Sequence, residues 1–138
     1  MKPLLSRCAH AVALAALMAG SGAAGADAAA YRATLDADGV QRVAIVGGSY
    51  FFRPARILVQ AGQPLEISVS LEPGIVPHRF VLEAADGPPL VDVPLGQAPK
   101  AVRMNLKAGD YLFYCPNQLL GFKSHRERGM AGVLEVRE

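Results

Sequence analysis

The chain has 138 residues, and its 14 lysine and arginine residues against 12 aspartate and glutamate residues give a net charge of +2. This balance excludes the strongly basic surface that nucleic-acid-binding proteins use. Hydrophobic residues make up 51% of the chain, but alanines near the N-terminus raise that figure, so it needs no membrane explanation. The length is that of a leader followed by one domain with one core.

The N-terminal segment has the pattern of a secretory signal peptide. Lys2 and Arg7 supply a positive start, residues 9–19 form an apolar run, and small residues with A-x-A cleavage sites follow. The apolar run is shorter than the roughly 20 residues that span a bilayer. We therefore expect residues 1–30 to be a signal peptide and residues 31–138 to be a single periplasmic domain, with an uncleaved N-terminal anchor as the alternative.

The rest of the sequence reads as short β-strands separated by turns rich in glycine and proline. Alternating or β-branched runs occupy residues 40–46, 56–60, 65–71, 78–83, 101–106, 111–115 and 132–136. No stretch has helical periodicity over three turns. Residues 84–100 are rich in proline and glycine, and we expect them to be a long surface connection. The pattern predicts an all-β Greek-key sandwich of about seven or eight strands.

Removal of the leader takes away Cys8 and His10, which leaves one cysteine and two histidines. The mature chain then keeps four ligands of soft or borderline character: His78, Cys115, His125 and Met130. A thiolate, two imidazoles and a weak thioether are the ligands of a mononuclear blue-copper site. A lone cysteine in an exported protein is also typical of a reactive thiol or an intermolecular bridge.

The predicted strands bring these ligands toward one end of the sandwich. Cys115 ends its strand immediately before Pro116, which cannot extend the strand pairing. His78 begins its strand immediately after Pro77, and His125 lies on the next connection. The same segment then supplies the methionine, so one pole of the sandwich should collect all four ligands.

Four stretches of the chain resemble the cupredoxins, and together they cover nearly the whole mature domain. They are residues 52–65, 76–80, 109–115 and 125–136. The resemblance is to the plastocyanin-like, azurin-like and EfeO-type cupredoxin domains of exported bacterial proteins. It also extends to the copper domain of oxidase subunit II, but that binuclear site needs two cysteines, and Cys115 is the only cysteine after Cys8. The resemblance implies one copper ion per chain, cycling between two valences in a monomeric protein that is not an enzyme.

Two features depart from the family pattern. Nine residues, 116–124, separate Cys115 from His125, where cupredoxins usually have fewer. Arg79 follows the first histidine, where the family often has a polar residue that ties the ligand loops together. Nine residues have ample reach, so we expect the loop to return His125 to the metal, even if part of it folds as a helical turn.

Side chains around the ligands suggest how the site is enclosed and where a partner docks. We expect Phe80, Leu112, Phe113 and Phe122 to keep water off the metal. Apolar residues of the long loop, with basic residues around them, would form a contact zone for an acidic redox partner such as a cytochrome or an oxidoreductase. The loop residues concerned are Leu119, Leu120, Phe122, Lys123, Arg126 and Arg128. A solvated basic loop with its leucines folded inward is the alternative.

The sequence thus favours an electron carrier and leaves other functions open. A copper carrier or tolerance protein without a redox partner would use the same ligands. Zinc could occupy three of them, and a metal-free binding module would use none. A thiol hydrolase built on Cys115 and His125 would need a cleft and an oxyanion hole, which no sequence feature supports.

Overall fold

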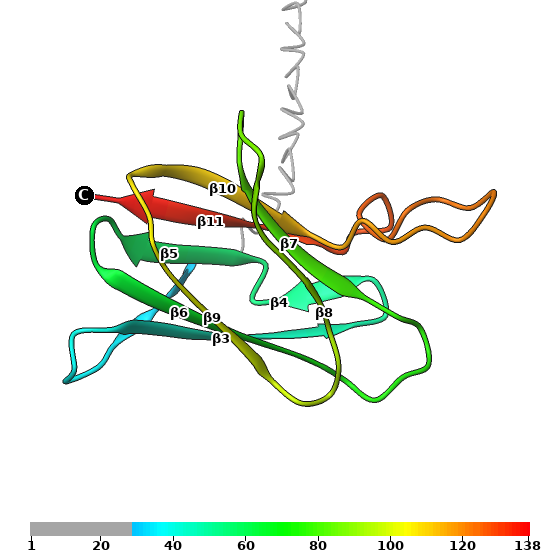
Figure 1. The fold of residues 1–138 in the computed structure, drawn as a ribbon, viewed down its shortest axis with the longest axis horizontal. Helices are drawn as coiled ribbons and strands as arrows, with labels where there is room; N and C mark the ends of the chain where they lie inside the picture. The colour runs from blue at the N-terminus through cyan, green and yellow to red at the C-terminus, as the bar shows by residue number, and fades with distance from the viewer. Residues whose placement is uncertain (1–28) are drawn as a thin grey trace, which may run out of the picture.

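Alternating apolar and polar residues build two β-sheets that pack face to face (Figure 1). The computed structural model describes residues 29–138, so the predicted signal peptide lies outside them except for its last two residues. The described residues contain eleven strands and no helix. Accordingly, none of these residues forms a helix that could cross a membrane.

The first sheet has six strands and the second has five. In spatial order, the first contains β1 (Tyr31–Arg32), β5 (Arg56–Gln60), β11 (Ala131–Arg137), β10 (Gly109–Tyr114), β7 (Arg79–Ala84) and β8 (Pro89–Pro94). The second contains β2 (Thr34–Leu35), β3 (Gln41–Gly48), β6 (Pro64–Leu71) and β9 (Lys100–Asn105), with β4 (Phe51–Arg53) paired to β3. The chain crosses between the sheets after β1, β4, β5, β6, β8 and β9, in keeping with a Greek-key sandwich.

The all-β prediction is confirmed, and each of the seven predicted runs forms a strand. Eight strands of the described chain have five or more residues, and three shorter ones bring the total to eleven rather than seven or eight. The expectation that residues 84–100 form one long surface connection is wrong, because β8 lies within them and pairs with β7. The prolines at both ends of β8 are tolerated because it is an edge strand.

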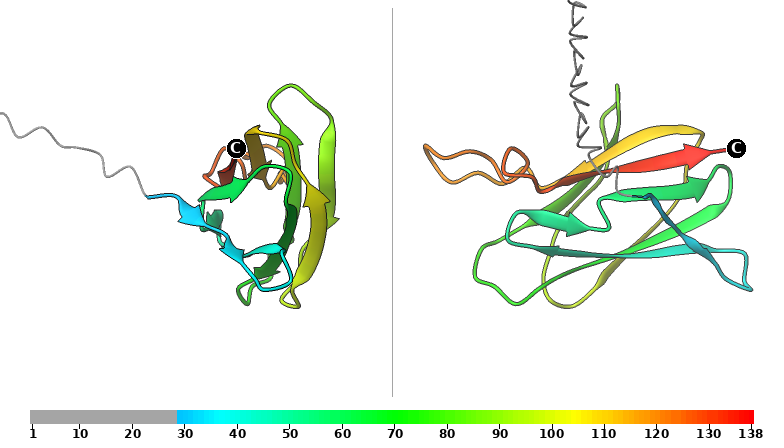
Figure 2. Two further views of the ribbon diagram at one scale, coloured as in Figure 1. Left: turned by 90° about the vertical axis from the view of Figure 1, so that its left-hand side faces the viewer. Right: turned by 180° about the vertical axis from the view of Figure 1, so that it is seen from behind.

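The core lies between the two sheets, as the end-on view shows (Figure 2). Strand β6 buries Leu65, Ile67 and Val69 and turns the residues between them outward. Near one end of the core, the rings of Phe52, Phe80 and Phe113 pack with centroids 5.6–5.7 Å apart. Each buried side chain of this size contributes about 1.5–3 kcal/mol through removal from water.

That end of the sandwich, which we call the loop pole, carries four connections. They are the β3–β4 turn, residues 72–78 before β7, residues 95–99 between β8 and β9, and residues 115–130 between β10 and β11. The second and fourth of these project furthest from the sheets, to the right in Figure 1. The C-terminus lies at the opposite end (Figure 1). All four predicted ligands fall at the loop pole.

Gly132 should be needed for packing beneath the loop pole. A Cβ at this position would overlap the Phe113 ring and lie 2.5 Å from the main-chain oxygen of Ala55. We expect Gly132→Ala to lower the free energy of unfolding by about 1–3 kcal/mol, as overpacked cores do. The measurement is urea denaturation of the metal-free protein. Gly96→Ala is the matched control, because its Cβ would meet no atom within 4 Å. Equal stability of the two variants would contradict this packing.

Candidate metal centre

Three of the predicted ligands point their donor atoms at one another. The Nδ1 atoms of His78 and His125 lie 3.0 Å apart. The Sγ atom of Cys115 lies 3.8 Å from Nδ1 of His78 and 3.4 Å from Nδ1 of His125. Cys115 is fully buried, and each histidine is 6% exposed. Residues separated by up to 47 positions thus form one compact, nearly closed cluster.

The cluster has the dimensions of a metal site. Its three distances leave a point in the plane of the donor atoms that is about 2 Å from each of them, close to the roughly 2.0 and 2.3 Å that Zn²⁺ makes to imidazole nitrogen and thiolate sulfur. Two imidazoles and a thiolate in a trigonal arrangement are typical of a copper site. The donor set and its spacing therefore both fit a first-row metal ion.

Cys115 is held in place by its own main chain. Its N–H donates to the carbonyl of Met130, 3.0 Å away, which extends the β10–β11 pairing one step beyond Tyr114 and Ala131. Its carbonyl accepts from the N–H of Arg126 at 3.0 Å. The cysteine Sγ also accepts the N–H of Arg79 at 3.3 Å, which fixes the sulfur.

His78 is the residue immediately before β7. Its carbonyl accepts the N–H of Leu95, which follows β8, so the pairing of β7 with β8 continues one step and fixes the main chain of His78. The preceding Pro77 ends the exposed segment of residues 72–77. The side chain of His78 is thereby directed inward from a strand end rather than from a free loop.

His125 returns to the cluster because the long loop is pinched at its base. The N–H of His125 donates to the carbonyl of Asn117 at 2.8 Å, so residues 118–124 form a closed excursion, which we call the finger. The turn at residues 125–129 begins with a capping box, in which Ser124 and Glu127 bond each other's N–H groups. The nine residues between Cys115 and His125 therefore leave the His125 ring beside the other two donor residues.

The link between the two ligand loops comes from a residue that the sequence did not single out. The Nδ2 atom of Asn117 donates to the carbonyl of Pro77 at 2.8 Å and joins the two segments. Arg79, which occupies the position where a linking residue was expected, instead pairs with Asp92 on β8. The two ligand loops are therefore linked, but the donor is Asn117 on the β10–β11 connection rather than the residue after His78.

Met130 lies fully buried at the same pole. Its N–H donates to the carbonyl of His125 at 2.9 Å, and its carbonyl receives the N–H of Cys115. Its Cε methyl group is 3.2 Å from the position that a Cβ on Gly47 would take, so this glycine makes room for the thioether side chain. The main chain of Met130 is thus hydrogen-bonded both to His125 and to Cys115.

Burial holds both imidazoles in the form that binds metals. Desolvation lowers the pKa of His78, and the neighbouring His125 lowers it further. Desolvation likewise lowers the pKa of His125, with a contribution from the positive charge of Arg128. Metal ligation requires neutral imidazole, so both shifts favour it.

An aromatic residue outside the predicted ligand set contacts both imidazoles. The ring of Tyr50, in the β3–β4 turn, meets His125 edge to face at 5.0 Å and His78 at 6.4 Å. Phe80 and Phe113 are fully buried and belong to the same core cluster as Cys115 and Met130. Phe122 is 56% exposed and lies at the hollow over His125 rather than in the core. Tyr50 was not singled out from the sequence. The signal that could have identified it is an aromatic residue in the turn between Gly47-Gly48 and the next strand.

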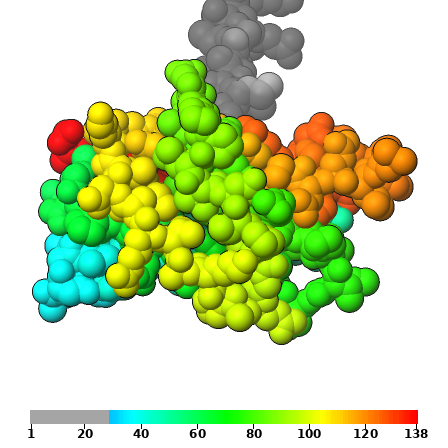
Figure 3. Space-filling view, viewed as in Figure 1, coloured from blue at the N-terminus to red at the C-terminus, as the bar shows by residue number. Residues whose placement is uncertain are grey.

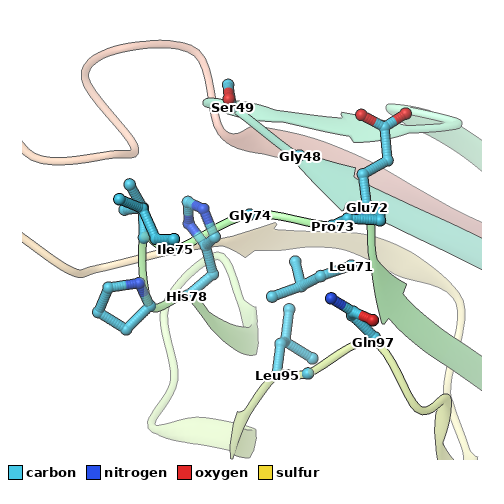
Figure 4. Close-up of a pocket in the computed structure, with 13 residues that line it drawn as sticks. Gly48, Ser49, Leu71, Glu72, Pro73, Gly74, Ile75, His78, Leu95 and Gln97 are labelled. Atoms are coloured by element: carbon cyan, nitrogen blue, oxygen red, sulfur yellow. The ribbon is translucent and has the colours of Figure 1, made fainter.

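Two hollows reach the small exposed parts of the histidines. The larger, about 510 Å³, lies beside His78 under residues 72–77. Figure 4 shows Leu71 and Leu95 on one side of this hollow and His78 with Ile75 on the other. The smaller, about 110 Å³, lies over His125 and is lined by Tyr50, Leu119, Phe122, Lys123 and Arg128 as well.

The finger extends the pole into solvent. It projects from the body together with residues 72–77 in the space-filling view (Figure 3). Leu119 is 70% exposed and Leu120 is 95% exposed, so the alternative in which the leucines fold inward is wrong. Two of the basic side chains lie over rings, Arg126 over Tyr114 and Arg128 over Tyr50.

Comparisons with known proteins agree with this fold. The sequence matches no family model and no curated protein. The structure is similar to the metal-binding domain of the Cu(I)-exporting P-type ATPase CopA of Streptococcus pneumoniae, with a TM-score of 0.60 and 23% identity over 80% of this chain and 97% of that one. It is also similar to auracyanin of Roseiflexus castenholzii (TM-score 0.60, 16% identity, 77% and 99% covered).

A third similar structure is auracyanin A of Chloroflexus aurantiacus, described as a "blue" copper protein, with a TM-score of 0.56 and 21% identity. The alignment covers 72% of this chain and 100% of auracyanin A. Likeness at these identities establishes the architecture of the chain. The described domain has the cupredoxin fold, as the sequence resemblance implied.

Proposed function

We propose that this chain is a periplasmic protein that binds one copper ion and carries single electrons between redox partners. The residues that would hold the ion are His78, Cys115, His125 and Met130. The observation that carries the proposal is the buried triangle of one thiol and two imidazoles with edges of 3.0, 3.4 and 3.8 Å. When bound there, copper supplies a centre that gains or loses one electron.

The way the chain holds these ligands suits electron transfer. Main-chain bonds fix Cys115 on two sides, and the Arg79 N–H fixes its sulfur. A cluster that hardly rearranges is suited to a metal that changes valence. The buried rings of Phe80 and Phe113 exclude water from the core side. A carrier needs no substrate cleft, so we assign the chain no enzymatic activity.

The finger supports a docking role for the His125 side of the pole. His125 is 6% exposed, and its hollow opens between Tyr50 and the finger. The exposed Leu119 and Phe122 line this hollow, with Lys123 at its edge. Apolar atoms allow close approach, and a basic edge favours an acidic redox protein, such as a cytochrome or an oxidoreductase. The similar auracyanins, one of them described as a "blue" copper protein, are in keeping with a copper site at this pole.

Copper delivery is the second candidate, and one comparison favours it. The similar CopA domain belongs to a Cu(I)-exporting ATPase and was solved with Cu(I). A delivery protein would pass the ion to an acceptor, whereas an electron carrier would keep it through many valence changes. Reversible bleaching by ascorbate, with the copper retained after repeated cycles, supports the carrier. Release of copper to an acceptor within one cycle supports delivery.

The first test is metal content. We expect the mature protein to bind one equivalent of copper per chain and to show an intense thiolate-to-copper(II) absorption band. Cys115→Ser should abolish this band, because the thiolate is its source. Elemental analysis and visible spectroscopy measure both results. Two tightly held coppers per chain, zinc in preference to copper, or a coloured Cys115→Ser protein would contradict the proposal.

Met130 should tune the site more than hold it. A thioether at an axial position is a weak ligand that sets the potential. We expect Met130→Leu to retain copper and raise the reduction potential, and Met130→Gln to retain copper and lower it. Protein-film voltammetry measures both shifts. Loss of copper from a folded Met130→Leu protein would instead make Met130 a principal ligand or a structural support.

Lys123 is the sharpest probe of docking, because Arg126 and Arg128 lie over aromatic rings and would change the pole if altered. Lys123→Glu should slow electron exchange with an acidic cytochrome several-fold at low ionic strength and should leave the visible spectrum unchanged. The difference should shrink as salt rises. Lys107→Glu, between β9 and β10 at the other end of the sandwich, is the control. Equal rates for the two variants would move docking elsewhere.

A further inference from the structure

Tyr50 occupies a backbone conformation that tyrosine rarely adopts. It follows Ser49 in the two-residue turn between β3 and β4, and its φ is 65°. This left-handed region is normally left to glycine or asparagine, because a Cβ there crowds the main chain. Residues held in such conformations cluster at functional sites, where the rest of the structure keeps them in place.

The neighbouring residues sharpen the point. Gly47 and Gly48 directly precede the turn, and a Cβ on Gly48 would overlap the Phe51 ring. Gly48 therefore occupies a position where a side chain would clash. Tyr50, in contrast, has a main-chain conformation that favours glycine. The turn would form more easily with glycine at position 50, so the retained side chain calls for another explanation.

The contacts of the Tyr50 ring supply that explanation. One edge-to-face contact is to His125 at 5.0 Å and another is to His78 at 6.4 Å. The guanidinium of Arg128 lies over the same ring, 4.5 Å from its centroid. Arg128 belongs to the turn between His125 and Met130, so the ring is held between the β3–β4 turn and the ligand-bearing segment.

The ring also limits the approach to the cluster. It lines the hollow over His125 but does not line the larger hollow beside His78. Because it contacts both imidazoles, neither ring can turn away from the cluster on that side without displacing Tyr50. Groups that fix the orientation of metal ligands commonly change metal affinity by about 10- to 100-fold when they are removed.

We infer that Tyr50, held under Arg128, is a positioning residue of the metal centre that fixes both imidazoles and slows the loss of the metal. The inference rests on the proposed copper binding. It also bears on the choice between functions, because a chain that clamps its ligands is built to keep the ion rather than to pass it on.

The test is the rate at which ascorbate-reduced protein loses Cu(I) to excess bathocuproine disulfonate. Tyr50→Ala should transfer copper at least about 10-fold faster than the natural protein. Tyr50→Phe should transfer at the natural rate, because the contacts described are made by the ring. Phe51→Ala is the matched control: its ring, on the same hairpin, lies under Arg53. It should also keep the natural rate.

A second variant separates metal retention from folding. In the metal-free state, Tyr50→Gly should unfold at a higher temperature than Tyr50→Ala, because glycine adopts φ of 65° without crowding. Both should nevertheless lose copper equally fast, because both lack the ring. Natural transfer rates in Tyr50→Gly or Tyr50→Ala, or equal acceleration in Phe51→Ala, would overturn the inference. A natural protein that takes up no copper would instead overturn the proposed function.

Discussion

One main-chain hydrogen bond beyond the end of β10 determines the geometry of the loop pole. The N–H of Cys115 donates to the carbonyl of Met130, so the pairing of β10 with β11 continues into the segment that contains the other ligands. The carbonyl of Cys115 then accepts from Arg126, the residue after His125. The cysteine is therefore bonded on one side to Met130 and on the other to the residue after His125, and these bonds fix the relative positions of the three residues.

Burial of these groups is costly unless they satisfy one another. A polar group removed from water without a partner loses on the order of 1–3 kcal/mol. At this pole the two Nδ1 atoms face each other, and the Cys115 sulfur faces both and the Arg79 N–H. Among residues 29–138, no fully buried side-chain nitrogen or oxygen lacks a partner. The lowered pKa of each histidine reflects the same dry surroundings, which also favour metal over protons.

The sequence predicted features that depend on residue type and period, and missed those that depend on contact. Two-residue alternation located seven strands, whereas the prolines that bound β8 made an edge strand resemble a loop. The rarity of soft ligands identified the histidines and the cysteine, which the structure brings together. Asn117 and Tyr50 were missed because their roles arise from partners about 40 and 75 positions away, Pro77 and His125. No spacing rule reports such contacts.

The extra length between Cys115 and His125 shows how a surface can change without changing the site beneath it. The bond from His125 to the Asn117 carbonyl closes the finger at its base, so residues 118–124 lie outside the ring of contacts that positions the ligands. Lengthening a closed surface loop costs little, because the closure entropy grows only slowly with length. The exposed tip at Leu120 can therefore vary in sequence, while the bonds at the base keep the imidazole in place. The exposed surface and the position of the imidazole thus depend on different parts of one connection.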